Sequence, residues 1–248
     1  MNGVALFFVL IESLVTYFPE LASIPTIWLQ LAVVSVWVGV ILLIAGLINR
    51  FSSKDPELIR KIVHIGTGNV ILLAWWLHIP AWVGITASIL ASIVTLLSYQ
   101  FPILPGINSV GRKSLGTFFY AVSIGVLVAW FWSINQPHYA VLGILVMTWG
   151  DGFAALIGQR FGKHSYTVWG TKKSWEGSLT MFLVSYIVSS SILLSVQGNN
   201  LPTWLVSLTI ALVATALEAF SLYGIDNLSV PIGSAALGFF LYQLLQLT

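Results

Sequence analysis

The 248-residue sequence contains no cysteine, which excludes disulfide bonds and metal sites built from thiolates. Charged residues are also scarce: they make up 7% of the chain, whereas a soluble domain carries about 25%. A chain with so few charges cannot cover a water-facing surface. The formal net charge of +2 is small, and it gives no reason to expect a nucleic-acid partner.

Several common catalytic motifs are missing as well. The sequence has no Walker A phosphate loop, because the stretch from Gly158 to His164 fails that motif in spacing and in its last residue. It has no protein-kinase catalytic loop and no His-Glu-x-x-His zinc motif. If this chain carries out phosphate chemistry, it uses none of the common soluble frameworks.

What the sequence does have is long apolar segments, since 58% of its residues are hydrophobic. A membrane-spanning helix needs about 20 mostly apolar residues. Nine segments qualify: 3–18, 27–49, 62–79, 80–99, 116–134, 139–158, 175–197, 204–222 and 229–247. They predict an all-α polytopic membrane protein with about nine transmembrane helices in a single domain, 1–248. The first segment is short and carries Glu12, but it lacks the features of a cleaved secretory signal, so we interpret it as a retained helix.

The lysines and arginines occupy only three of the connections between these segments. All ten lie in the loops 50–61, 100–115 and 159–174. Because basic loops favour the cytoplasmic side, we expect these loops and the N-terminus to face the cytosol (or the stroma of a plastid) and the C-terminus to face outside. Topology alone explains most basic loops, but it does not require acids. The acids that accompany the basic loops therefore indicate a polar site at this face: Asp151, Glu176, Glu218 and Asp226.

Asp151 lies in the stretch Trp149-Gly-Asp-Gly-Phe-Ala, about 10 Å inside the predicted end of its segment. A carboxylate at a helix centre costs about 2.5–3.5 kcal/mol on insertion scales, and intramembrane acids usually mark functional sites. Gly150 and Gly152 allow close backbone approach or a local break in the helix. The alternative is a structural role, in which Asp151 pairs with a loop lysine and fixes the fold.

Lys172 and Lys173 directly precede a helix that we expect Ser174 to cap, with Glu176 in its first turn. Cations oppose the macrodipole at a helix N-terminus, and a bound phosphate would remove that conflict. Free N–H groups, the dipole and two ammonium groups would then converge on one anion. The simpler interpretation is that both lysines are solvated residues that only set the topology.

Arg60, Lys61 and His64 lie on nearby faces of a helix that enters the bilayer. A lone histidine near a membrane surface is more often a hydrogen-bonded structural residue than a ligand or a base. Both interpretations of His64 stay open at this point.

The last polar stretch runs from Glu218 to Pro231. Glu218 is expected about one helical turn inside the membrane. Ser229 is expected to cap the last helix, with Pro231 in its first turn. Asp226 is either a solvated acid beside a helix or, together with Asp151, a ligand of Mg²⁺, a hard cation that takes carboxylate and phosphate oxygens.

Four blocks of the sequence together resemble the polyprenol and phytol kinase family, to which dolichol kinase and the CTP-dependent diacylglycerol kinase are more distantly related. The blocks are Arg60-Lys-x-x-His64, Gly150-Asp-Gly-Phe-Ala with Gly158 and Gly162, Lys172-Lys-Ser-Trp-Glu-Gly-Ser178, and Asp226-Asn-Leu-x-Val-Pro231. Each block is weak alone, but their spacing is specific. The resemblance covers about residues 50–240.

The resemblance implies transfer of the γ-phosphoryl group of a nucleoside triphosphate, typically CTP, to a long isoprenoid alcohol. With phytol as acceptor the product would be phytyl phosphate, which feeds tocopherol synthesis. Asp151 is then the central acid, either as a Mg²⁺ ligand or as the base that accepts the alcohol proton, and Glu176 is the second catalytic candidate. The expected Mg²⁺ ligands are Asp151, Asp226 and Glu218. The residues expected to bind phosphate are Lys172, Lys173, Arg160, Lys113, Arg60 and Lys61, with His64 and Asn227 as polar support.

Two other functions stay open at this point. A lipid cytidylyltransferase would also need acids, cations and Mg²⁺, although the Lys/Arg/Asp-rich C-terminal signature expected of that family is absent. A transporter tends to show inverted repeats and a site near the midplane, whereas this sequence shows no repeat and its polar cluster is one-sided. Phytol, geranylgeraniol and farnesol all stay candidate acceptors, and CTP, ATP and UTP stay candidate donors.

Overall fold

The computed structural model describes residues 25–51, 56–99, 101 and 115–246. Within this part of the chain, eight helical spans are long and apolar enough to cross a membrane. Their helices are α2 (Thr26–Phe51), α3 (Pro56–Gly68) followed by α4 (Val70–Trp76), α5 (Ala81–Ser98), α7 (Gly116–Ser133), α8 (Pro137–Leu145) continuing through the π-helix η2 (Val146–Asp151) into α9 (Gly152–Phe161), α10 (Trp175–Gln197), α11 (Leu201–Ala219) and α12 (Asp226–Gln246). Eight of the nine predicted segments are thereby confirmed. The ninth, 3–18 with Glu12, lies outside the described residues.

Many serine and threonine side chains in these helices form hydrogen bonds within their own helix. Hydroxyl side chains bond to a carbonyl one turn back, as Ser92 does to Ser88, Ser189 to Ser185 and Ser207 to Thr203. Such bonds give these hydroxyl groups a partner in lipid, where an unpaired polar group is costly. Large apolar side chains on the outer faces of α2 and α5 are exposed, as expected for surfaces that contact lipid tails.

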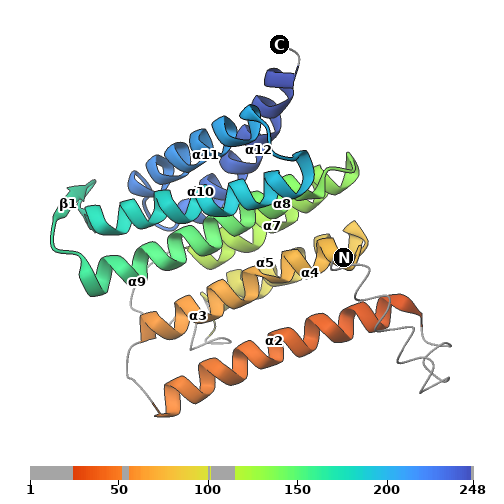
Figure 1. Cartoon of the computed structure of the whole chain (residues 1–248). Helices are drawn as coiled ribbons and strands as arrows, with labels where there is room; N and C mark the ends of the chain where they lie inside the picture. Colours follow the sequence, from red (N-terminus) through yellow and green to blue (C-terminus); the bar gives the residue numbers. More distant parts are fainter. Residues whose placement is uncertain (1–24, 52–55, 100, 102–114, 247–248) are drawn as a thin grey trace.

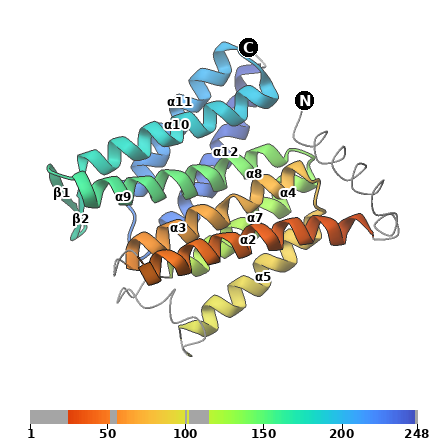
Figure 2. The same ribbon diagram turned by 60° about the horizontal axis from the view of Figure 1, so that its bottom comes forward.

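The segment α8–η2–α9 is the centre of the bundle. Tyr139, Leu142 and Met147 on it are fully buried. Helices α10 and α12 pack directly against this segment, α7 packs on α8 and α12, and α2 lies on the outside against α3 (Figures 1 and 2). Asp151 therefore belongs to the most enclosed helix of the molecule.

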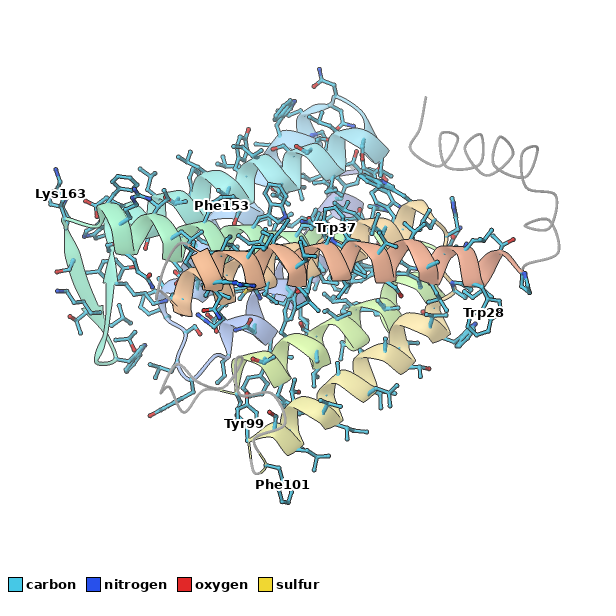
Figure 3. All side chains as sticks on the ribbon, turned by 90° about the horizontal axis from the view of Figure 1, so that it is seen from below. Trp28, Trp37, Tyr99, Phe101, Phe153 and Lys163 are labelled. Carbon is cyan, nitrogen blue, oxygen red and sulfur yellow. The ribbon has the colours of Figure 1, made fainter. Side chains whose placement is uncertain are left out.

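The basic residues gather at one end of the bundle. Lys163 lies at that end and Trp28 at the opposite end (Figure 3). The C-terminus of α2, the N-terminus of α3 and the C-terminus of α9 all reach the basic end (Figure 1). The one-sided charge distribution predicted from the sequence is thus present in the described residues.

One predicted boundary was wrong. The segment 62–79 begins earlier, because α3 starts at Pro56 and the span runs from Glu57 to Trp76. Arg60 and Lys61 are therefore on the same helix as His64, as we expected from their spacing, although the segment boundaries placed them in the loop 50–61. Their charges are tolerated because each pairs with a carboxylate, Arg60 with Glu57 one turn back on the same helix.

A short β-hairpin follows α9, where the sequence predicted only a loop. Strands β1 (Ser165–Val168) and β2 (Thr171–Ser174) pair antiparallel. Trp169 and Gly170 between them both have positive φ, 50° and 79°, which is the backbone of a type I′ turn. The sequence did not predict the hairpin, because its two strands are polar and lack the alternating apolar pattern of a half-buried sheet.

Two expectations for the C-terminal region were also wrong. Helix α12 begins at Asp226, so Ser229 does not cap it and Pro231 lies inside it. The oxygen that accepts a bond from the Asp226 N–H is Oγ of Ser221, at 2.8 Å. Glu218 is in the last turn of α11, which ends at Ala219.

Candidate functional site

Asp151 ends the π-helical turn η2 inside the central helix. Such wide turns occur frequently at functional sites, because they change which face of a helix a side chain points from. The glycines on either side permit close packing by neighbouring helices. A Cβ on Gly150 would lie 2.5 Å from Sδ of Met181, and one on Gly152 would lie 2.6 Å from Cγ1 of Ile65. Helices α10 and α3 thereby hold the backbone around Asp151 from two sides.

Lys61 is the partner of Asp151. Its Nζ lies 2.5 Å from Oδ2 of Asp151 and donates to the Asp151 backbone oxygen at 3.4 Å. The Lys61 side chain is only 4% exposed. Nε2 of His64 lies 3.9 Å from the same Oδ2. A buried carboxylate needs such a compensating charge, and the cation is a lysine that the sequence assigned to the loop 50–61 and that the structure places on α3.

A second ion pair lies one turn before Lys61. The guanidinium of Arg60 donates to both carboxylate oxygens of Glu57, at 2.9 and 2.6 Å. Sequence reasoning missed Glu57 as part of the site. The i, i+3 spacing of the two residues on a helix was the signal that could have found it.

The entrance to α10 has the predicted cap. Oγ of Ser174 accepts a bond from the Gly177 N–H at 3.1 Å. The N–H of Trp175 donates to the His164 carbonyl. Free N–H groups at this helix start were expected to bind an anion, but the two first-turn N–H groups named here already have partners.

Glu176 holds the start of the hairpin. Its carboxylate accepts bonds from the backbone N–H groups of Lys163 and His164, at 3.1 and 3.2 Å, and contacts Nδ1 of His164 at 2.8 Å. It does not line the cavity described below. Its place in the structure is that of a brace between α10 and β1.

The two lysines of the hairpin have different surroundings. Nζ of Lys173 donates to Oε1 of Glu218 at 2.6 Å and also contacts the Glu218 backbone oxygen, which ties β2 to the end of α11. Lys172 is exposed and faces the cavity without a carboxylate partner among the described residues.

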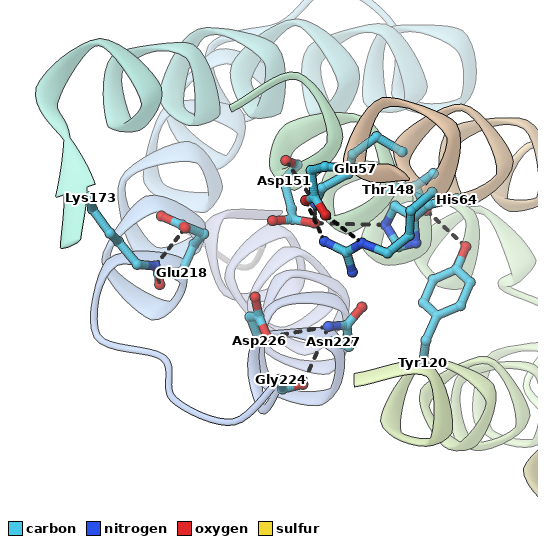
Figure 4. A network of polar contacts seen from close by, with 12 residues as sticks. Glu57, His64, Tyr120, Thr148, Asp151, Lys173, Glu218, Gly224, Asp226 and Asn227 are labelled. Carbon is cyan, nitrogen blue, oxygen red and sulfur yellow. Dashed lines mark hydrogen bonds and ion pairs between the residues drawn. The ribbon is translucent and has the colours of Figure 1, made fainter. Parts of the chain in front are cut away.

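Asp226 and Asn227 begin α12 opposite these groups. Nδ2 of Asn227 donates to the Gly224 carbonyl at 3.3 Å and to Oδ1 of Asp226 at 3.2 Å. Asp226 points towards Asp151 (Figure 4) and has no ion-pair partner among the described residues. Asn227 therefore helps to orient a carboxylate that has no direct ion pair among the described residues.

All of these segments surround one polar cavity of about 930 Å³. Its charged lining residues are Glu57, Arg60, Lys61, Asp151, Lys172, Lys173, Glu218 and Asp226. Of the predicted phosphate-binding residues, Arg160 lies outside this lining, where its guanidinium sits over the Phe161 ring, and Lys113 lies outside the described residues. The formal charges of the lining cancel, so the cavity can accept an anion once a cation accompanies it.

The donor set fits Mg²⁺ bound together with a nucleotide. No three His, Asp or Glu side chains form a ready-made metal cage in the part of the chain that the structure describes. Mg²⁺ usually needs only one or two protein carboxylates, because substrate phosphates and water complete its shell. Asp151 and Asp226 line the same cavity and could supply them. Glu218 is committed to Lys173, which makes it the weaker candidate.

A second cavity of about 810 Å³ lies on the opposite face of the central helix and is lined mostly by apolar side chains. Trp149 and Phe153 line this groove, whereas Asp151 and Ala155 line the polar cavity. The indole N–H of Trp149 is satisfied by Oδ1 of Asn69 at 3.0 Å. A molecule in the apolar groove would be separated from Asp151 by the helix itself.

Comparison with curated proteins finds clear relatives. The chain is 51% identical to a phytol kinase of Synechocystis sp. over 209 residues, which cover 84% of this chain and 90% of that protein. It is 30% identical to the chloroplastic farnesol kinase of Arabidopsis thaliana over 79% of this chain and 69% of that protein. It is 28% identical to phytol kinase 1 of the same plant over 73% of this chain and 65% of that protein. No family model matches the chain, and no solved structure matches it significantly.

Proposed function

The chain belongs to the phytol kinase family, and we propose that it transfers the γ-phosphoryl group of CTP to the hydroxyl of phytol in its polar cavity. The product is phytyl phosphate. One observation carries this proposal: the four sequence blocks that resemble the family lie far apart in the chain and yet each contributes residues to the lining of one cavity. A phosphoryl-transfer site needs acids for a metal and cations for phosphates, and both are present there.

The donor binds on the hairpin side of the cavity. Lys172 is exposed there and has no carboxylate to neutralise it among the described residues, so it is the first cation available to a triphosphate. Lys173 and Arg60 also line the cavity, each beside its own carboxylate. Phosphate oxygens compete with these carboxylates for the same N–H donors, which lets the cavity bind a triphosphate without new charged residues.

Asp151 and Asp226 would hold the Mg²⁺ that accompanies the nucleotide. When bound, this ion neutralises charge that develops on the phosphates during transfer. Lys61 keeps Asp151 in its charged form and in a fixed orientation, because its ammonium group lies 2.5 Å from Oδ2. Asn227 helps to orient Asp226, because its Nδ2 donates a 3.2 Å hydrogen bond to Oδ1.

The cavity lies where the two substrates can meet. A long isoprenoid alcohol keeps its tail in the bilayer and its hydroxyl near the interface, whereas the nucleotide arrives from water. The cavity is at the basic end of the bundle, at the ends of α3, α9, α11 and α12. By the positive-inside bias this end faces the cytosol or stroma. The C-terminus, which follows the far end of α12, is then outside, and the N-terminus is inside with the predicted segment 3–18 as a ninth span.

The test uses purified protein, phytol and CTP labelled either in the γ-phosphate or in the cytidine. Label from the γ-phosphate alone should appear in the lipid product. Cytidine label in the lipid would identify a cytidylyltransferase instead. Nucleotide-independent flux of solute into liposomes, without any labelled lipid, would identify a transporter. Repeating the assay with ATP and UTP, and with geranylgeraniol and farnesol, ranks donors and acceptors.

A further inference from the structure

The ring of His64 carries a polar atom that has no partner. Nε2 of His64 is buried and makes no hydrogen bond in the part of the chain that the structure describes. Leaving such a group unsatisfied typically costs about 1–3 kcal/mol, so native structures usually give it a partner or a function. This atom differs from the other buried unpaired atoms in its position, because it lies beside the site carboxylate.

The distance between His64 and Asp151 suits a bridging oxygen. Nε2 and Oδ2 are 3.9 Å apart, which is too far for a direct hydrogen bond. One oxygen placed about 2.8 Å from each atom would bond to both, once the side chains that enclose Nε2 move apart to admit it. A hydroxyl group can do this because it donates one hydrogen bond and accepts others.

Neighbouring side chains hold the His64 ring in a fixed position. It packs against the ring of Tyr120 with centroids 4.8 Å apart. The Tyr120 hydroxyl lies 3.0 Å from Oγ1 of Thr148, which in turn donates to the Ile144 carbonyl at 2.6 Å. Thr148 belongs to the same π-helical turn as Asp151. Contacts through Tyr120 and Thr148 therefore link the position of the His64 ring to the π-helical turn that carries Asp151.

His64 also lies on the membrane side of the site. It is one helical turn further along α3 than Arg60, and so deeper in the bilayer. In Figure 4, His64 and Tyr120 lie on one side of Asp151, whereas Lys173 and Glu218 lie on the other. The nucleotide occupies the hairpin side, which leaves the His64 side for the lipid acceptor.

We propose that His64 Nε2 and the Asp151 carboxylate together bind the hydroxyl of the lipid alcohol and point its oxygen at the γ-phosphate. This assignment rests on the proposed kinase function. It gives the orphaned nitrogen a partner, and it gives the acceptor a fixed position at the boundary between bilayer and cavity. His64 is thus an alcohol-binding residue, in addition to the groups that bind the nucleotide.

The experiment compares three substitutions at this position in the full-length protein reconstituted in lipid. His64→Ala removes the ring. His64→Gln places an amide nitrogen near the position of Nε2, and His64→Asn places one near Nδ1. His138→Ala is the matched control, because His138 is another buried histidine with an unpaired Nε2, on α8 at the end opposite to Lys163. Each variant is assayed for the KM of phytol, the KM of CTP, kcat and the melting temperature.

We expect His64→Ala to lower kcat/KM for phytol about tenfold, equivalent to about 1.4 kcal/mol, with the KM of CTP changed less than twofold. His64→Gln should recover more activity than His64→Asn, and His138→Ala should keep the wild-type ratio of the two KM values. The inference is overturned if His64→Ala leaves the phytol kinetics unchanged, or if it raises both KM values equally, as a structural or water-bridging role would. Absence of phytyl phosphate from the wild-type protein would instead refute the kinase function itself.

Discussion

The Nζ atom of Lys61 lies 2.5 Å from Oδ2 of Asp151, although 90 residues of chain separate the two side chains. This contact joins the start of α3 to the π-helical turn of the central helix. It brings together two of the sequence blocks that resemble the kinase family. The ion pair stabilises the fold around the site in addition to forming part of it, because either charge would be costly to bury alone at this depth.

The first prediction concerns this pair. Lys61→Met leaves a buried carboxylate without its cation, and should destabilise the protein by about 3–5 kcal/mol. The double variant Lys61→Met with Asp151→Asn removes both charges and should be more stable than Lys61→Met alone. Unfolding curves in mixed micelles measure both. Equal stability of the single and double variants would show that the two side chains are not coupled.

The sequence predicted the helices well because hydropathy is a local property. Segments 27–49, 116–134 and 175–197 match α2, α7 and α10 to within a few residues. The Ser174 cap was also predictable, since capping depends on neighbours three residues away. These features need no knowledge of the rest of the fold.

The pairings within the site could not be read in the same way. Lys61 with Asp151 and Lys173 with Glu218 are contacts across 90 and 45 residues, and they arise only when helices pack. The sequence grouped Glu176 with the catalytic acids by its neighbours. Its carboxylate instead turns to the backbone of the hairpin, because the hairpin places two N–H groups there.

The second prediction separates phosphate-binding lysines from topology lysines. Lys172→Ala should raise the KM of CTP about tenfold and leave the KM of phytol unchanged, because Lys172 faces the cavity and lacks a carboxylate partner among the described residues. Lys163→Ala is the control, since Lys163 is exposed on the same loop but outside the cavity lining. If both variants behave alike, Lys172 does not bind the nucleotide.

The third prediction concerns the close packing of Gly152, the residue after Asp151, against α3. Gly152→Ala places a Cβ 2.6 Å from Cγ1 of Ile65 and should cost about 1–3 kcal/mol of stability and lower kcat by displacing Asp151. Gly46→Ala, with nothing within 4 Å of its Cβ, should be neutral or slightly stabilising. Adding Ile65→Ala should restore part of the loss in Gly152→Ala. Failure of that rescue would argue against the packing explanation.

The fourth prediction tests the orientation. The chain has no cysteine, so single-cysteine variants report one site each. Lys163→Cys on the basic end should resist an impermeant thiol reagent applied to the outside of intact cells. Asn199→Cys, between α10 and α11 at the other end, should react with it. The opposite labelling pattern would invert the topology and place the cavity outside.

The most direct test of the account compares Asp151→Asn with Glu176→Gln in the phytol phosphorylation assay. Asparagine keeps the size of the side chain and an oxygen that Lys61 can donate to, but it leaves the Lys61 ammonium without its counter-charge, so the melting temperature should fall. Turnover is therefore measured per folded protein, well below the melting temperature of each variant. We predict that kcat falls at least about a thousandfold in Asp151→Asn, or about 4 kcal/mol, whereas Glu176→Gln retains measurable turnover because its carboxylate only braces the hairpin. Activity of Asp151→Asn within about threefold of wild type at saturating Mg²⁺, a change below about 1 kcal/mol, would contradict the central role of Asp151 in this cavity.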